Sequence, residues 1–305
     1  MAKILVTPRS LTKGGDPALE TLRNAGHVLV FCRPGEMPDE EELLRLLPGC
    51  AGYLAGVEKV SARVLKAAAG LKVISRNGAG IDNVDLEAAR QLGIAVLPAP
   101  GANARGVAEL TIGLILALLR SIPYSDGALK AEQWKRRKGI EVLGRTLGLV
   151  GCGDIGKQVV LMAVGVGMKV EAFRRHPEAS FHPEGFRWVS WEECLAHAEI
   201  LSLHCPSSGK PVIDRQAISH MRKGVFLVNT ARADLVDEEA LLEALEQGQV
   251  AGYAMDVYLQ EPPLDFRLVK HERVIATPHI GGFTDESVNR ATEFAVRNIL
   301  ETLKE

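Results

Sequence analysis

The sequence lacks most of the features of secreted, membrane-spanning or nucleic-acid-binding chains. Its five cysteines are odd in number and form no CxxC pair, which disfavours a disulfide scaffold or a zinc ribbon. The 36 Lys and Arg residues nearly balance the 38 Asp and Glu residues, so no overall field attracts nucleic acid or anionic membranes. The most apolar stretch, residues 107–119, is too short to cross a bilayer and contains Glu109. The first residues become polar too early for a secretory signal. We therefore expect a cytoplasmic protein with no membrane and no nucleic-acid partner.

The composition is that of a globular protein. It has 47% hydrophobic and 24% charged residues, which argues against disorder. A length of 305 residues predicts two domains at about 150 residues each. The 30 glycines are the one mild excess, so their positions matter more than their number.

Short aliphatic runs alternate with helical patterns, which predicts parallel sheets covered by helices on both faces. Ser61 and Asp85 are expected helix N-caps, and Gly70 and Gly93 follow the ends of those helices. The final helix is expected at about residues 285–304 and is amphipathic, so it could pack on either domain. Strands are expected at 4–6, 28–31, 52–55, 71–75 and 94–97, and then at 146–150, 169–173, 200–204, 225–229, 252–256 and 274–276. The fold class is therefore α/β with doubly wound parallel sheets, and the second has the six strands of a dinucleotide-binding domain.

A glycine turn follows the strand expected at 146–150 and opens a helix. In GCGDIG, Gly151 permits the tight turn, Gly153 lets the backbone approach a pyrophosphate, and Gly156 lets helix and strand pack closely. The helix N-terminus adds free N–H groups and a positive dipole. A glycine-rich turn without a ligand is the alternative, but the strand–turn–helix context favours a dinucleotide.

The residues after the next strand indicate which dinucleotide. NAD enzymes place an acid there for the ribose 2′-hydroxyl, but this chain has Arg174 and Arg175, with Arg174 eighteen positions after Gly156. A guanidinium binds a 2′-phosphate in a forked geometry, so NADP(H) is preferred and NAD(H) is the alternative. The third interpretation is that Arg174 and Arg175 are surface residues that bind no ligand. Glu171 lies too early on the strand to be the ribose acid.

Three ionisable residues end or follow later strands, at the edge where open α/β sheets bind ligands. Arg232 and His279 each come just after an expected strand, Asp256 ends one, and Glu261 lies in the loop beyond Asp256. Together they suit carbonyl reduction: an imidazolium donates a proton to the carbonyl oxygen, a carboxylate raises its pKa, and the arginine holds the substrate oxygens. Each residue alone is more often structural, as a surface ion pair or a turn.

Two other patterns favour structural interpretations. The basic run at 134–138 lacks interleaved aromatic residues, so a solvated loop or helix end is favoured over a nucleic-acid site. His204 and Cys205, with Cys194 and His197 upstream, resemble metal ligands. Adjacent His and Cys residues cannot easily bind one tetrahedral ion, so no metal is expected.

Seven ordered motifs resemble the D-isomer-specific 2-hydroxyacid dehydrogenases over the whole chain, and most of all the phosphoglycerate-dehydrogenase-like branch. The motifs are RNGAGIDNVDL (76–86), PGAN (100–103) with VAE (107–109), GCGDIG (151–156), LHCP (203–206), NTARADLVD (229–237), DVYLQEP (256–262) and TPHIGG (277–282). The resemblance implies a flavodoxin-like substrate domain of residues 1–100 plus 284–305 and a Rossmann domain of residues 101–283. It also implies a cleft between them and a homodimer joined through the nucleotide domain.

The resemblance assigns roles to single residues. Arg232, Glu261 and His279 are the expected catalytic residues, with hydride transfer and His279 as proton donor. The backbone amides of Asn77, Gly78, Ala79 and Gly80 are expected to bind the substrate carboxylate. Asp154 and Ile155 would contact the pyrophosphate, and Asp256 would bind the nicotinamide amide. The remaining cofactor contacts are expected from Cys205, Pro206, Thr230, Ala231 and Gly281.

Several departures from the family pattern bear on the substrate and the cofactor. Most relatives have Asp where Arg174 stands, which supports NADP(H). The loop at 55–58 has no arginine for a substrate phosphate, and Glu58 would repel a phosphate if it faced the site. The chain ends at Glu305, so we expect no serine-sensing regulatory domain. Arg136, in the basic run, could add to anion binding.

A short 2-keto acid such as glyoxylate or hydroxypyruvate is therefore the expected substrate. The alternatives are phosphoglycerate dehydrogenase activity, a non-catalytic redox-sensing corepressor-like NAD(P)-binding protein, and last an enzyme of the formate or phosphite kind.

Overall fold

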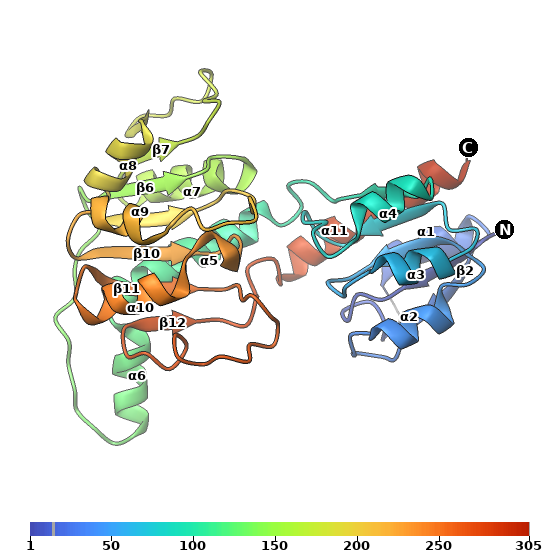
Figure 1. The fold of residues 1–305 in the computed structure, drawn as a ribbon, viewed down its shortest axis with the longest axis horizontal. Coiled ribbons are helices and arrows are strands. Elements are labelled where there is room, and N and C mark those ends of the chain that lie inside the picture. Colours follow the sequence, from blue (N-terminus) through green and yellow to red (C-terminus); the bar gives the residue numbers. More distant parts are fainter. Residues whose placement is uncertain (14–15, 305) are drawn as a thin grey trace. The chain divides into compact units, whose positions relative to one another are not determined.

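The computed structural model describes residues 1–13 and 16–304, which divide into two compact units (Figure 1). Unit 1 contains Met1–Asn103 with Gly282–Glu305, and unit 2 contains Ala104–Gly281. The chain leaves unit 1 once and returns to it once, so unit 1 is assembled from both ends of the sequence. The boundaries expected after residue 100 and before residue 284 lie three and two residues from these crossing points.

Unit 1 is built on a five-stranded parallel sheet in the order β2-β1-β3-β4-β5, which is the flavodoxin-like order. The strands are β1 (Lys3–Val6), β2 (Val28–Phe31), β3 (Cys50–Ala55), β4 (Val73–Arg76) and β5 (Ala95–Leu97). The helices are α1 (Pro17–Asn24), α2 (Glu40–Leu46), α3 (Ala62–Ala67), α4 (Leu86–Gln91) and α11 (Asp285–Lys304). Ser61 and Asp85 cap α3 and α4 by accepting from Val64 N and Ala88 N, which confirms both predicted starts.

Both faces of this sheet are buried, as its nearly continuous aliphatic strands require. Side chains alternate along β1, so Ile4 and Val6 join a core cluster with α1 and α11. Leu5 points to the other face and packs with residues of α2, α3 and α4. The sheet is therefore the middle layer of three.

The C-terminal helix α11 packs on unit 1 and completes its core. Ile299 is fully buried against β3, where a Cβ added to Gly52 would lie 3.3 Å from the Ile299 side chain. Asn298 Nδ2 donates to Ser75 Oγ at 3.0 Å and to Pro98 O at 3.1 Å. These contacts join the last residues of the chain to strands formed by its first hundred.

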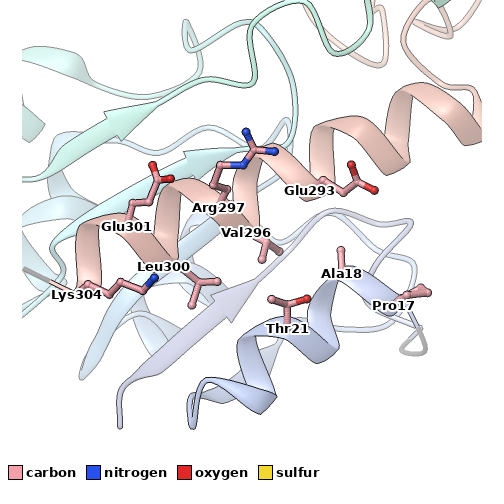
Figure 2. Close-up of a pocket in the computed structure, with 9 residues that line it drawn as sticks. All are labelled: Pro17, Ala18, Thr21, Glu293, Val296, Arg297, Leu300, Glu301 and Lys304. Atoms are coloured by element: carbon pink, nitrogen blue, oxygen red, sulfur yellow. The ribbon is translucent and has the colours of Figure 1, made fainter.

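A surface pocket of about 480 Å³ lies between α1 and α11, and Figure 2 shows the residues that line it. Its lining residues are Pro17, Ala18, Thr21, Glu293, Val296, Arg297, Leu300, Glu301 and Lys304. The charged lining side chains are of both signs and all come from α11. This lining includes no residue that the sequence predicted for a site.

Unit 2 is built on a seven-stranded parallel sheet in the order β12-β11-β10-β9-β6-β7-β8. Counted from its first strand, this is the Rossmann order with one further strand at the β12 edge. The strands are β6 (Thr146–Val150), β7 (Lys169–Phe173), β8 (Phe186–Trp188), β9 (Ile200–Leu203), β10 (Val225–Asn229), β11 (Val250–Met255) and β12 (Val274–Ala276). The helices are α5 (Ala104–Leu119), α6 (Ile122–Lys130), α7 (Asp154–Gly165), α8 (Trp191–His197), α9 (Arg215–His220), α10 (Glu238–Glu246) and the 3-10 turn η1 (Ala233–Leu235).

Helices cover both faces of the unit 2 sheet. Leu147 and Leu149 of β6 pack with α5 and α7, whereas Leu201 and Leu203 of β9 pack with α8, α9 and α10. Within residues 1–13 and 16–304, no single helix has the length and apolar composition of a membrane span. The pair α5 and α6 meets that criterion only jointly, with a 66° bend at the junction.

The edge strand β8 shows that the prediction of six strands in this domain was wrong. It has only three residues, with Arg187 in the middle, so it offers no aliphatic run to recognise. The ring of Phe186 meets Phe181 and Trp188 edge-to-face, with centroids 5.1 and 5.0 Å apart. Trp188 Nε1 donates to Glu178 O at 3.2 Å. Parallel pairing with Val170, Glu171 and Ala172 therefore joins this strand to β7, and the aromatic contacts pack it against the segment that precedes it.

Candidate active site

The glycine turn of residues 151–156 joins β6 to α7 at the carboxyl edge of the unit 2 sheet, beside the point where the strand order reverses. Gly151 has φ of +91°, and a Cβ there would lie 2.6 Å from His204 O. A Cβ on Gly156 would lie 2.9 Å from Gly151 O, so this glycine lets α7 pack closely. Both glycines have the geometry that their spacing predicts.

Gly153 has a different environment, because no described atom lies within 4 Å of its Cβ position. It precedes Asp154 as the N-cap residue of a 12-residue helix, whose N–H groups and dipole attract an anion. Asp154 is exposed and Ile155 is half-buried in the first turn. A small residue with open space at a helix start fits the pyrophosphate of a dinucleotide, which requires close approach to the backbone.

Arg174 and Arg175 follow β7 directly at the same edge. Arg174 Nη1 donates to Cys152 O at 3.3 Å, so its guanidinium lies against the glycine turn, and Arg175 is exposed. Glu171 is buried within β7 and accepts from Arg187 Nη2 at 2.6 Å. The structure therefore places a cation, and not Glu171, beside the turn.

Asp256 organises the loop that carries His279. Its carboxylate is 1% exposed and accepts from Thr277 Oγ1 at 2.7 Å, Ile280 N at 2.8 Å and Gly281 N at 2.8 Å. A Cβ on Gly281 would lie 3.0 Å from Asp256 Oδ2, so glycine gives this carboxylate room to bind the loop amides. The predicted nicotinamide contacts of Asp256 and Gly281 stay predictions, and the bonds show that Asp256 positions the loop.

His279 and Glu261 form a hydrogen-bonded pair, as the proposed proton transfer requires. His279 Nδ1 lies 2.7 and 2.8 Å from the two carboxylate oxygens of Glu261. That bond raises the pKa of His279, while burial and the Arg232 cation act in the opposite direction. Among the described residues His279 Nε2 has no partner, so Glu261 occupies one ring nitrogen and leaves the other open.

Arg232 leaves the carboxyl end of β10 in extended backbone conformation. Its Nη1 donates to Ala231 O at 2.7 Å, and its carbonyl oxygen accepts from Asn229 Nδ2 at 2.8 Å. Asn229 is fully buried and also accepts from Ala231 N at 3.0 Å. Asn229, which the sequence patterns did not single out as a site residue, therefore shapes the turn that presents Arg232.

The other predicted cofactor residues also follow strands at this edge. Cys205 and Pro206 come after β9, and Thr230 and Ala231 come after β10. Thr230 is buried, with its Oγ1 2.9 Å from Thr111 Oγ1 of α5. Burial raises the pKa of the Cys205 thiol. Its burial therefore disfavours the thiolate form.

The loop at 77–80 in unit 1 corrects one predicted contact. Asn77 N donates to Ala55 O at 2.9 Å, so this amide is not available for a substrate carboxylate. The N–H groups of Gly78, Ala79 and Gly80 donate to no described residue. Asn77 Oδ1 is buried without a partner among the described residues. Of the four amides expected to bind the substrate carboxylate, those of Gly78, Ala79 and Gly80 therefore remain.

Glu58 corrects a second expectation, because its side chain points into unit 1. It is 2% exposed and accepts from Tyr53 Oη at 2.6 Å, Gly56 N at 2.8 Å and Thr7 Oγ1. The condition under which Glu58 would repel a substrate phosphate, that it faces the site, is therefore not met, and Glu58 gives no argument against a phosphorylated substrate. Arg76, to which the motif had assigned no role, donates to the carbonyls of Gly56 and of Gly80 (2.8 Å). It thereby links the loop at 55–58 to the loop at 77–80.

The remaining sequence signals have local partners. His197 Nδ1 lies 2.9 Å from Glu171 Oε2, and His204 Nε2 lies 2.9 Å from Ser202 Oγ. Among the described residues, no three His, Cys, Asp or Glu side chains could hold a metal ion together. In the basic run, Arg137 lies 3.7 Å over the Tyr124 ring and pairs with Glu272 at 3.0 Å.

Comparison with known proteins adds independent findings. Residues 112–281 match the family model "D-isomer specific 2-hydroxyacid dehydrogenase, NAD binding domain". The hydroxypyruvate reductase of Thermotoga maritima is 38% identical over 274 residues, which cover 87% of this chain and 89% of that protein. The D-3-phosphoglycerate dehydrogenase of Methanocaldococcus jannaschii is 38% identical, covering 100% of this chain and 58% of that protein.

Solved structures agree with these matches. The TT0316 protein from Thermus thermophilus superposes with a TM-score of 0.88 at 36% identity, covering 99% of this chain and 97% of that one. A glyoxylate reductase from Paecilomyes thermophila has a TM-score of 0.89 at 28% identity, covering 100% and 96%. The chain spans only about half of several phosphoglycerate dehydrogenases, including 51% of the human protein.

Proposed function

The chain belongs to the D-isomer-specific 2-hydroxyacid dehydrogenase family, and from this premise we propose that it is a nicotinamide-dependent reductase of short 2-keto acids. The observation that carries the proposal is the bond between His279 Nδ1 and Glu261 at the carboxyl edge of unit 2. Arg232 lies within electrostatic reach of this pair. An imidazole with a raised pKa beside an arginine can protonate a carbonyl oxygen while a carboxylate is held.

Each residue of this set has one task. The nicotinamide, when bound, supplies the hydride. His279 donates the proton from Nε2, because Nδ1 is occupied by Glu261. Glu261 keeps the imidazolium form populated to higher pH. Arg232 binds the substrate carboxylate and carbonyl oxygens, and in the reverse direction His279 accepts the proton of the hydroxyl group.

Glyoxylate, hydroxypyruvate or a related short acid is the proposed substrate. The three unbonded amides of Gly78, Ala79 and Gly80 suit a carboxylate. The loop at 55–58 contains no arginine for a phosphate, and Arg76 is engaged by loop carbonyls. The alternative substrate, 3-phosphoglycerate, would depend on other cations such as Arg136. Relatives named for either activity resemble this chain, so overall similarity does not distinguish the two substrates. The choice between them therefore rests on the loops at 55–58 and 77–80.

NADP(H) is the proposed cofactor, and NAD(H) is the alternative. Support comes from the guanidinium of Arg174 against the glycine turn, with Arg175 beside it. A homodimer is proposed on the resemblance. A cytoplasmic location without a nucleic-acid or membrane partner is proposed from the cysteine pattern and the balanced charge.

The test is a panel of short 2-keto acids assayed with NADPH and with NADH. We expect turnover of glyoxylate or hydroxypyruvate, and faster turnover with NADPH. Far better reduction of phosphohydroxypyruvate than of hydroxypyruvate would overturn the substrate proposal. Cofactor binding without turnover of any acid would favour the corepressor-like alternative.

The same panel applied to Arg174→Asp tests the cofactor. The substitution replaces a cation that attracts the 2′-phosphate by an anion that repels it, so the KM for NADPH should rise at least about tenfold more than that for NADH. The matched control is Arg215→Asp. It makes the same charge change at an arginine on α9, which pairs with Glu243. Equal losses for both cofactors in the Arg174 variant would contradict the assignment.

A further inference from the structure

An ion cluster at the connection between β7 and β8 contains Glu178, Lys157 and Arg174, of which only Arg174 has a role in the proposed function. Glu178 Oε2 lies 2.7 Å from Lys157 Nζ and 3.8 Å from Arg174 Nη1. Lys157 stands on α7, four residues after Gly153, and Arg174 donates to Cys152 O within the glycine turn. One carboxylate oxygen is therefore shared by two cations beside the turn that is proposed to bind the cofactor.

Glu178 is held in this position by its surroundings. Ser180 Oγ donates to Glu178 Oε1 at 3.3 Å, and Trp188 Nε1 donates to the Glu178 carbonyl at 3.2 Å. Phe181, three residues further on, packs against Phe186 of β8, and Lys157 Nζ lies 5.5 Å from the Phe181 ring centre. The backbone at Glu178 is thus anchored to β8, independently of its carboxylate.

We propose that Glu178 is an internal anion at the 2′-phosphate site of the cofactor, and that Lys157 is a second cation of that site. The inference rests on the proposed use of NADP(H). A phosphate oxygen makes the same charge-assisted hydrogen bonds as a carboxylate oxygen, so the place of Glu178 Oε2 between Lys157 and Arg174 marks where a phosphate oxygen fits.

This arrangement makes Glu178 a determinant of cofactor selectivity. A 2′-phosphate must displace the Glu178 carboxylate to reach both cations, whereas NAD(H), without that phosphate, leaves the ion cluster intact. Glu178 therefore reduces a preference for NADP(H) that Lys157 and Arg174 would otherwise make stronger. The three side chains are 27%, 42% and 40% exposed for Lys157, Glu178 and Arg174, so the effect is moderate and sensitive to salt.

The experiment is calorimetric binding of NADP⁺ and NAD⁺ to the full chain at low salt, without turnover. Glu178→Gln should tighten NADP⁺ binding about 3- to 10-fold and change NAD⁺ binding less than about twofold, because only the phosphate meets the freed cations. Lys157→Met should weaken NADP⁺ binding by a similar factor. The matched control is Glu246→Gln, which removes the same charge away from the proposed site. Glu246 ends α10, just before β11 begins, so it lies at the amino edge of the sheet.

The outcomes separate this inference from the cofactor proposal. Wild-type protein without a preference for NADP⁺ would remove the cofactor proposal, and tighter NADP⁺ binding by Glu178→Gln would still support the ion cluster as a phosphate site. Wild-type preference for NADP⁺ with unchanged binding in both variants would overturn the inference alone. Weaker NADP⁺ binding by Glu178→Gln would also overturn it.

Discussion

Single residues at the active site depend on carboxylates for their position. His279 has φ of +53°, a conformation that costs a residue other than glycine on the order of 1–3 kcal/mol. Its N–H donates to Thr277 O at 3.0 Å, and Asp256 binds the amides of Ile280 and Gly281 on its far side. The buried Asp256 therefore holds the backbone, and Glu261 holds the ring.

The Glu261 bond to His279 sets the pH dependence of ketone reduction. The reaction needs the imidazolium, so the rate falls as pH rises through the pKa of His279, which Glu261 raises. In Glu261→Gln this pKa is lower, so the fall should move to lower pH in profiles of kcat/KM. Asp265→Asn, in the same loop but paired with Arg267 at 2.7 Å, should leave the profile in place. An unshifted profile for Glu261→Gln would remove Glu261 from its role.

At the scale of elements, two glycines of the β6–α7 turn meet different requirements, one set by the backbone of the turn and the other by a ligand. Gly151 needs positive φ and has no room for a Cβ, whereas Gly153 has ordinary φ and open space. The structure of the turn thus requires the first glycine, and only a ligand would require the second.

Alanine at each position tests this division. Gly151→Ala should lower the free energy of unfolding by about 2–4 kcal/mol, from backbone strain and the clash with His204 O. Gly153→Ala should change it by less than about 1 kcal/mol, yet weaken dinucleotide binding at least about tenfold, because the methyl group occupies the open space. Urea denaturation and calorimetric titration measure the two effects. Unchanged dinucleotide affinity in Gly153→Ala would exclude this turn as the pyrophosphate site.

At the scale of the whole molecule, unit 2 exposes apolar side chains on α6 and on the segment that follows it. Ile122, Leu129, Trp134 and Leu143 are exposed, Trp134 by 81%. Figure 1 shows α6 and this segment extending from the body of unit 2. Exposed apolar residues that recur along residues 122–143 favour an interface, and a second copy of the chain is the proposed partner.

Light scattering should therefore give a mass near twice 33.0 kDa at micromolar concentration. Leu129→Glu should shift the protein toward the monomer, because it places a charge in the proposed interface. Leu86→Glu, at another exposed leucine on α4 of unit 1, should stay dimeric. A monomeric wild-type protein, or equal dissociation by both variants, would contradict a dimer formed through unit 2.

Local patterns were sufficient for much of the fold. The aliphatic runs of β6, β7 and β10 predicted the observed strand bounds, and Ser61 and Asp85 predicted the helix starts, because these signals lie within a few residues. The glycine turn and the arginine after β7 were predictable for the same reason. The short strand β8 was not, since its pairing with β7 and its aromatic contacts form only in the folded chain.

The contacts that decide the site come from tertiary structure. The burial of Glu58, the bond from Asn77 N to Ala55 O and the sharing of Glu178 between Lys157 and Arg174 each depend on the folded chain. Residue identity at 174 predicted a cation where an acid is usual, but it did not reveal that an internal carboxylate lies 3.8 Å from that cation. Whether a charged side chain faces a ligand or the protein depends on which neighbours the folded sheet brings within bonding distance.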